Sequence, residues 1–93
     1  MGKLNPLLHQ ELRLAIVTFL SGVERADFKK LVEVTKATKG NLSVQISKLQ
    51  AAEYLIVHKS FKNNYPHTEC ELTELGKKEY ALYVKALKQL LNI

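Results

Sequence analysis

Residues 38–54, TKGNLSVQISKLQAAEY, hold the pattern that decides the fold of this chain. Thr38 can serve as a helix N-cap, because its hydroxyl can accept a hydrogen bond from a free backbone N–H of the first turn. At about 100° per residue, Leu42, Ile46 and Leu49 fall on one apolar stripe. The stretch therefore predicts a helix that buries this stripe against the rest of the chain.

The opposite face of this predicted helix, near residues 39–52, has no acidic side chain. It carries Gly40, Asn41, Ser43, Val44, Ser47, Lys48 and Ala51. A solvated helix normally mixes both charge signs, so this face is better suited to approach phosphates and base edges. An ordinary half-buried helix with few charges is the alternative interpretation.

The chain has 93 residues, 46% of them hydrophobic, and a formal net charge of +5. This length and apolar content predict one small domain over residues 1–93, without repeats or linkers. The positive charge is uneven, because the segment 36–67 contains five lysines and one acid, Glu53. A basic segment of this kind favours a phosphate-rich partner.

A single cysteine, Cys70, excludes an internal disulfide and fits a reducing compartment. No apolar run approaches the roughly 18 residues that a membrane span needs, and the N-terminal residues do not resemble a signal peptide. We therefore expect a soluble cytoplasmic protein with no membrane partner.

Two helices are expected before residue 38. Asn5 and Pro6 form a typical helix start and predict a first helix near residues 6–20. Asp27 can cap a second, short helix near residues 27–34. The first has a predicted core face of Leu8, Leu12, Ala15, Ile16 and Phe19, and the second one of Phe28, Leu31 and Val32. Two short helices joined by a few residues are typical of a helix-turn-helix.

A β-hairpin is predicted near residues 55–72. Residues 55–61 are rich in β-branched and apolar side chains, and residues 68–72 alternate, with Cys70 on the apolar face. The segment 62–67 between them, KNNYPH, predicts a polar turn, because asparagine tolerates positive φ and proline interrupts strand pairing.

Thr73 can cap a last helix near residues 74–91. Its apolar positions spread over about 200° of the helical wheel, roughly twice what packing on one domain needs. The first helix also has apolar residues outside its core face. We therefore expect a homodimer through both ends of the chain, in which these residues are buried. The predicted interface contains Leu4, Leu7, Leu14, Val17, Tyr83, Leu87, Leu90 and Leu91.

In this order, these segments resemble a winged helix-turn-helix of the MarR/ArsR-type regulator group, and most closely its small, single-domain prokaryotic members. The matching residues are TKGNLSVQISKL at 38–49, YLIVHKSF at 54–61, Pro66-His67-Thr68, and LTELGKKEY at 72–80. The chain departs from the group at Glu53, where glycine is usual. It also departs at the hairpin tip, where arginine and glycine are common.

The resemblance implies a mainly helical α+β fold with a three-helix core, a hairpin wing and a long C-terminal helix. It implies that residues 39–52 enter the major groove, that residues 62–67 form the wing, and that the first and last helices dimerise. The implied function is transcription regulation by sequence-specific binding to an inverted repeat in double-stranded DNA.

The residues suggest how such a helix could read DNA. Asn41 can pair with an adenine edge, Lys48 can reach guanine or a phosphate, and Val44 suits a thymine methyl group. Gln45 lies between the two faces and could serve either. The full predicted DNA-contacting set is Lys36, Lys39, Gly40, Asn41, Ser43, Val44, Gln45, Ser47, Lys48, Lys59, Lys62, Asn63, Asn64, Tyr65 and His67.

Other chemistry is poorly supported. His58, His67 and Cys70 surround the hairpin, but zinc usually takes four ligands and no CxxC or HxxxH spacing supplies them. No catalytic triad, buried carboxylate pair or glycine-rich phosphate loop can be assembled. We therefore expect no metal, no other cofactor and no enzymatic activity. A winged-helix module that binds protein or RNA is the alternative function, and the residues identify neither an operator nor an effector.

Overall fold

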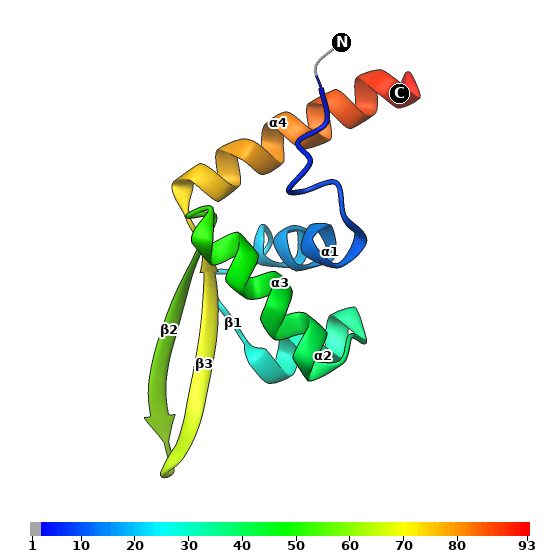
Figure 1. Ribbon diagram of the computed structural model, residues 1–93. Coiled ribbons are helices and arrows are strands. Elements are labelled where there is room, and N and C mark those ends of the chain that lie inside the picture. Colours follow the sequence, from blue (N-terminus) through cyan, green and yellow to red (C-terminus); the bar gives the residue numbers. More distant parts are fainter. Residues whose placement is uncertain (1–2) are drawn as a thin grey trace.

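The computed structural model describes residues 3–93. Its elements are α1 (Glu11–Leu20), β1 (Ala26–Asp27), α2 (Phe28–Thr35), α3 (Lys39–Ala51), β2 (Leu55–Lys62), β3 (Tyr65–Leu72) and α4 (Glu74–Leu91). The strands form one antiparallel sheet in the order β1-β3-β2. The predicted fold class is confirmed, because three helices pack together, a hairpin projects from them, and α4 lies across the opposite side (Figure 1).

Three helices begin at the residues that the sequence predicted. The side chains of Asp27, Thr38 and Thr73 accept hydrogen bonds from the backbone N–H groups of Lys30, Asn41 and Gly76. Each bond satisfies one N–H that has no partner within its helix, so these caps fix where the helices start.

The predicted start of the first helix is wrong, because α1 begins at Glu11 and is capped by Gln10. Asn5 forms a turn instead, with its Oδ1 accepting from the N–H of Leu7 at 2.9 Å. Its Nδ2 donates to the Tyr54 hydroxyl at 2.8 Å and to Glu79 at 3.2 Å. These bonds hold the N-terminal segment against α4 and the start of the hairpin, and they compete with helix formation.

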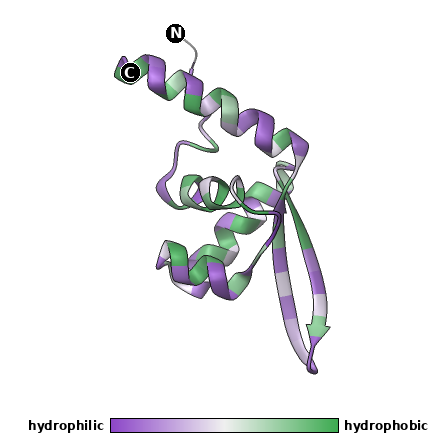
Figure 2. Cartoon of the chain, turned by 180° about the vertical axis from the view of Figure 1, so that it is seen from behind, coloured by the Kyte–Doolittle hydropathy of each residue, from purple (hydrophilic) through white to green (hydrophobic). Residues whose placement is uncertain are grey.

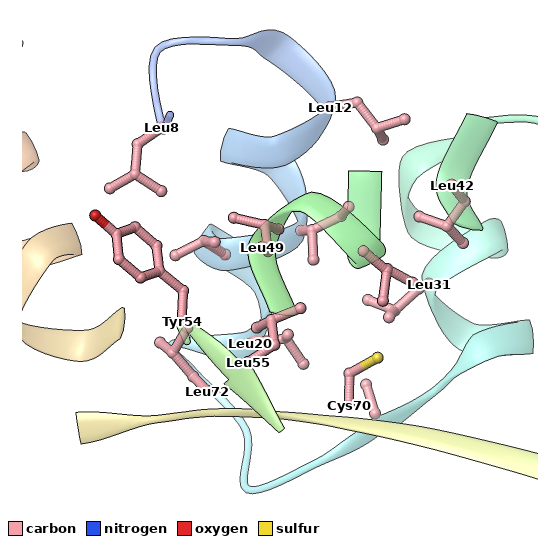
Figure 3. Close-up of a cluster of buried hydrophobic side chains, with 14 of the residues drawn as sticks. Leu8, Leu12, Leu20, Leu31, Leu42, Leu49, Tyr54, Leu55, Cys70 and Leu72 are labelled. Atoms are coloured by element: carbon pink, nitrogen blue, oxygen red, sulfur yellow. The ribbon is translucent and has the colours of Figure 1, made fainter. Parts of the chain in front are cut away.

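The core surrounds α1, which contacts α2, α3, β3 and α4. Leucines from most of the elements meet there, including Leu8, Leu31, Leu42 and Leu49 (Figure 3). Because α1 is enclosed on several sides, Val17 is 0% exposed and its predicted place in a dimer interface is wrong, while Ala15, predicted to be buried, is exposed. Tyr83 is also withdrawn from the interface, because it is 3% exposed and its hydroxyl bonds to His9 Nδ1 at 2.9 Å.

The turn of the hairpin is shorter than predicted. It consists of Asn63 and Asn64 alone, whose φ values of 52° and 65° are typical of a two-residue hairpin turn. Pro66 lies within β3 and pairs with Phe61. In the antiparallel ladder this pair is the non-hydrogen-bonded one next to the turn, so the missing N–H of proline would have faced the free edge.

The end of α3, the end of β3 and the start of α4 meet at one place, the α3–α4 junction, formed by Glu53, Tyr54, Thr73 and Gly76. Glu53 has a left-handed φ of 65°, and its N–H and that of Tyr54 donate to the carbonyls of Gln50 and Leu49. This is a Schellman motif with glutamate where glycine is usual. Thr73 then donates its N–H to the Tyr54 carbonyl at 2.9 Å and its hydroxyl to the Glu53 carbonyl at 2.7 Å.

α4 continues for 18 residues from this junction, about 27 Å. Hydrophobic positions are interspersed with polar ones along it to the C-terminal end (Figure 2). Within residues 3–93, none of the helices has the length and apolar character needed to cross a bilayer.

Candidate nucleic-acid interface

The outer face of α3 is exposed and carries no acid. Leu42, Ile46 and Leu49 are buried as predicted, which turns the opposite face outward. The exposed residues there are Lys39, Gly40, Asn41, Ser43, Val44, Ser47 and Lys48. The first turn holds no acidic residue, so the positive end of the helix dipole is left available for an anion.

Gln45 is the one predicted contact on α3 that points inward. It is 8% exposed, and its Oε1 accepts a 2.6 Å hydrogen bond from Nη1 of Arg13. Its Nε2 donates to Oδ1 of Asn41 at 3.2 Å. Gln45 therefore cannot also contact DNA, and we withdraw it from the predicted set. Nothing in the spacing around position 45 pointed to Arg13, since the contact spans 32 residues.

The hairpin and α3 diverge from the α3–α4 junction (Figure 1) and enclose two hollows. The first, of about 370 Å³, is lined by Phe28, Ser43, Ile46, Ser47, Gln50, Val57, Lys59 and Thr68. The second, of about 510 Å³, is lined by Asp27, Phe28, Lys29, Val32, Lys39, Pro66, His67 and Thr68. They share Phe28 and Thr68, and together they are called the wing groove below. It brings together five predicted contacts, Lys39, Ser43, Ser47, Lys59 and His67. It adds Lys29, Gln50 and Thr68, which the sequence did not indicate.

The two faces of the hairpin differ in charge. Lys59 pairs with Thr68 on the face toward α3. On the other face His58 bonds to Glu71 at 2.9 Å, and Nε of Arg25 lies 3.5 Å from the same carboxylate. The hydrogen bond from His58, with the nearby Arg25 charge, lowers the pKa of Glu71. Neither acid of β3 lines the wing groove, and Glu71 is paired on the opposite face.

The tip of the hairpin is polar and basic but also aromatic. Lys62, Asn63 and Asn64 are exposed there, and so is Tyr65, at 74%. Phe61, which the sequence analysis did not include, is 79% exposed. Lys36 is exposed at the left-handed C-cap of α2, before α3 begins.

The hairpin separates two of the side chains considered as metal ligands, Cys70 and His58. Cys70 is fully buried, which raises the pKa of its thiol to about 11. His58 lies on the opposite face, bonded to Glu71. Over residues 3–93, no three histidine, cysteine, aspartate or glutamate side chains come together as metal ligands.

A family model described as "winged helix DNA-binding domain" matches residues 12–91. The chain belongs to this family. The winged helix is also similar to the structure of the transcriptional regulator homologue protein from Pyrococcus horikoshii OT3, with a TM-score of 0.86 and 28% identity over 92% of this chain and 85% of that one. NadR in complex with 4-hydroxyphenylacetate aligns at a TM-score of 0.74 and 20% identity, over 94% of this chain and 64% of that one, and shows the fold alone. Among curated proteins, none matches.

These comparisons confirm the resemblance to winged-helix transcriptional regulators. The predicted dimer interface, near the two ends of the chain, is described here by the exposure of its residues. Of the predicted interface residues, Leu4, Leu7, Leu14 and Leu87 are half-buried, and Leu90 and Leu91 are exposed. Leu82 on α4 and Ile93 beyond its end are also exposed.

Proposed function

We propose that this winged-helix domain is a transcriptional regulator that binds a specific inverted repeat in double-stranded DNA as a homodimer. One observation carries the proposal: the exposed, acid-free face of α3 borders the wing groove, whose lining holds lysines and hydroxyls and one acid, Asp27, whose side chain caps α2. A DNA duplex needs both features, because base edges are read in the major groove while phosphates are neutralised beside it.

In the proposed complex α3 is the recognition helix. Asn41, Val44 and Lys48 face base edges, and Lys39 with Gly40 meets a phosphate at the start of the helix. The strand between the major and minor grooves runs along the wing groove, where its phosphates meet Ser43, Ser47 and Lys59. Lys62 and the Asn63-Asn64 turn reach the adjacent minor groove or its backbone.

The proposed dimer pairs the N-terminal segment and α1 of each subunit with α4 of the other. Leu87, Leu90 and Leu91 on α4 would meet Leu4, Leu7 and Leu14, and their joint burial would remove an apolar surface from water. A two-fold axis at this position would set two recognition helices about 34 Å apart, one turn of DNA. No catalytic role is part of the proposal.

A winged-helix module for RNA or protein is the second candidate. The exposed Phe61 and Tyr65 at the hairpin tip favour it, because aromatic rings stack on unpaired bases and dominate many protein interfaces.

Selection of binding sites from random duplex DNA, combined with sedimentation, decides between them. We expect an enriched palindrome and a dimer at micromolar concentration. Leu87→Glu with Leu91→Glu should give a folded monomer with greatly reduced affinity for the selected site. No enrichment, together with a wild-type monomer, would reject the regulator and leave the module for RNA or protein.

A further inference from the structure

Three polar side chains link the core to the recognition helix. Arg13 on α1 donates from Nε to the carbonyl of Leu7 at 2.6 Å, and from Nη1 to Oε1 of Gln45 at 2.6 Å. Gln45 donates from Nε2 to Oδ1 of Asn41 at 3.2 Å. We call this sequence of bonds the Arg13–Gln45–Asn41 chain.

The direction of each bond in this chain follows from the chemistry of its first member. A guanidinium has donors and no acceptor, so the buried Gln45 must turn its oxygen toward Arg13. The Gln45 amide nitrogen is then left to face Asn41, which must turn its own oxygen inward to accept. The amide nitrogen of Asn41, at the exposed first turn of α3, is left to point outward.

We infer that Arg13 and Gln45 are specificity-determining positioning residues, which make Asn41 present only hydrogen-bond donors to DNA. A donor-only amide selects base edges rich in acceptors, namely O6 and N7 of guanine or O4 of thymine. This replaces the expectation that Asn41 pairs with adenine, because that contact needs its oxygen and nitrogen to face the base together. The inference rests on the proposed function, since it assigns what the recognition helix reads.

Gln45→Glu tests the inference by reversing the direction of the hydrogen bond between residues 45 and 41. A carboxylate accepts from Arg13 but cannot donate, so Asn41 should rotate, donate inward and present its oxygen to DNA. Asn41→Asp should present an outward acceptor as well and leaves Gln45 in place. In binding-site selection, we expect both variants to move the preference at one position of each half-site from guanine or thymine to adenine or cytosine, by about tenfold or more.

Two controls separate this effect from charge and from misfolding. Gln50→Glu adds the same charge on an exposed site of α3 and should lower affinity for all sequences alike. Gln45→Glu in an Asn41→Ala background should change no base preference. Circular dichroism establishes that each variant is folded, and Asn41→Asp carries the test should Gln45→Glu not fold.

The possible results are distinguishable. A wild-type protein that enriches no sequence rejects the proposed function itself. A wild-type motif that stays the same in the folded variants, or that shifts equally in the Asn41→Ala background, overturns the donor-only assignment and leaves the regulator intact.

Discussion

The first turns of α3 and α4 are built alike but have opposite surroundings. Each has a threonine N-cap and a glycine close behind it, Gly40 in α3 and Gly76 in α4. A Cβ added to Gly76 would lie 2.4 Å from the Tyr54 carbonyl oxygen and 2.7 Å from Cδ1 of Leu72. A Cβ added to Gly40 would have no heavy atom of the described chain within 4 Å apart from its chain neighbours and the backbone of its own helix.

The difference explains why glycine occupies positions 40 and 76. Glycine costs a helix about 0.5–1 kcal/mol relative to alanine, so a use is expected at both positions. At Gly76 the use lies inside the molecule, because only glycine lets α4 approach the backbone after α3. At Gly40 packing within the described chain does not require it, and close approach of a DNA backbone to the start of α3 would.

Gly76→Ala should cause the largest change. Its methyl group would press against backbone and a buried leucine, and we expect a loss of roughly 3 kcal/mol in the free energy of unfolding. Urea denaturation followed by circular dichroism measures it. A loss under about 1 kcal/mol would mean that the two helices can separate easily, and the contrast with Gly40 would fail.

Removing the threonine cap should cost more unfolding free energy at α4 than at α3. Thr38→Ala loses a cap worth about 1 kcal/mol. Thr73→Ala loses an equivalent cap and also the hydroxyl bond to the Glu53 carbonyl, so we expect roughly 2 kcal/mol. Thermal and urea unfolding of both variants checks this order, which equal losses would contradict.

Gly40→Ala should strengthen the fold while weakening DNA binding. We expect a gain of about 0.5–1 kcal/mol in unfolding free energy from helix propensity. Affinity for the selected site should fall about tenfold, or roughly 1.4 kcal/mol, if a phosphate approaches this backbone. Gly22→Ala, on an exposed turn after α1, is the control and should leave affinity unchanged. Unchanged affinity in both variants would place the DNA backbone elsewhere.

The smallest change is expected from single charges. Lys39→Gln should leave the unfolding free energy within about 0.5 kcal/mol of wild type, and should lower the slope of log affinity against log salt by about one per subunit. Lys78→Gln, an exposed lysine on α4, should leave that slope unchanged. Filter binding or fluorescence anisotropy at several salt concentrations measures both. Equal slopes would remove Lys39 from the phosphate contacts.

Local chemistry made much of the fold predictable. The caps at Asp27, Thr38 and Thr73 were recognisable because each side chain bonds only three residues away. The apolar stripe of α3 was equally local. What failed depended on distant partners: Asn5 looked like a helix cap but bonds to side chains 49 and 74 residues away.

In the candidate site, too, residues set by local patterns were predictable and those set by distant partners were not. The exposed residues of α3 followed from the helical period, but Gln45 was ambiguous until α1 placed Arg13 beside it. The wing groove depends on the hairpin lying beside α2 and α3, so Lys29 and Thr68 had no signal in the sequence. Tyr83 and Val17 looked like surplus apolar residues because periodicity cannot show that the core encloses α1 on several sides.

The α3–α4 junction also has a mechanical consequence. The direction of α4 is fixed at its start by the Thr73 bonds and by the tight fit of Gly76, and further along by the bonds of Glu79 to Asn5 and of Tyr83 to His9. Over the length of α4, about 27 Å, a change of about 5° in this direction would move the far end by roughly 2 Å. In the proposed dimer this motion would change the distance between two recognition helices that must span one turn of DNA. A rigid junction would therefore fix the half-site spacing that the dimer accepts. A looser fit at Gly76 would let the protein bind half-sites at other separations.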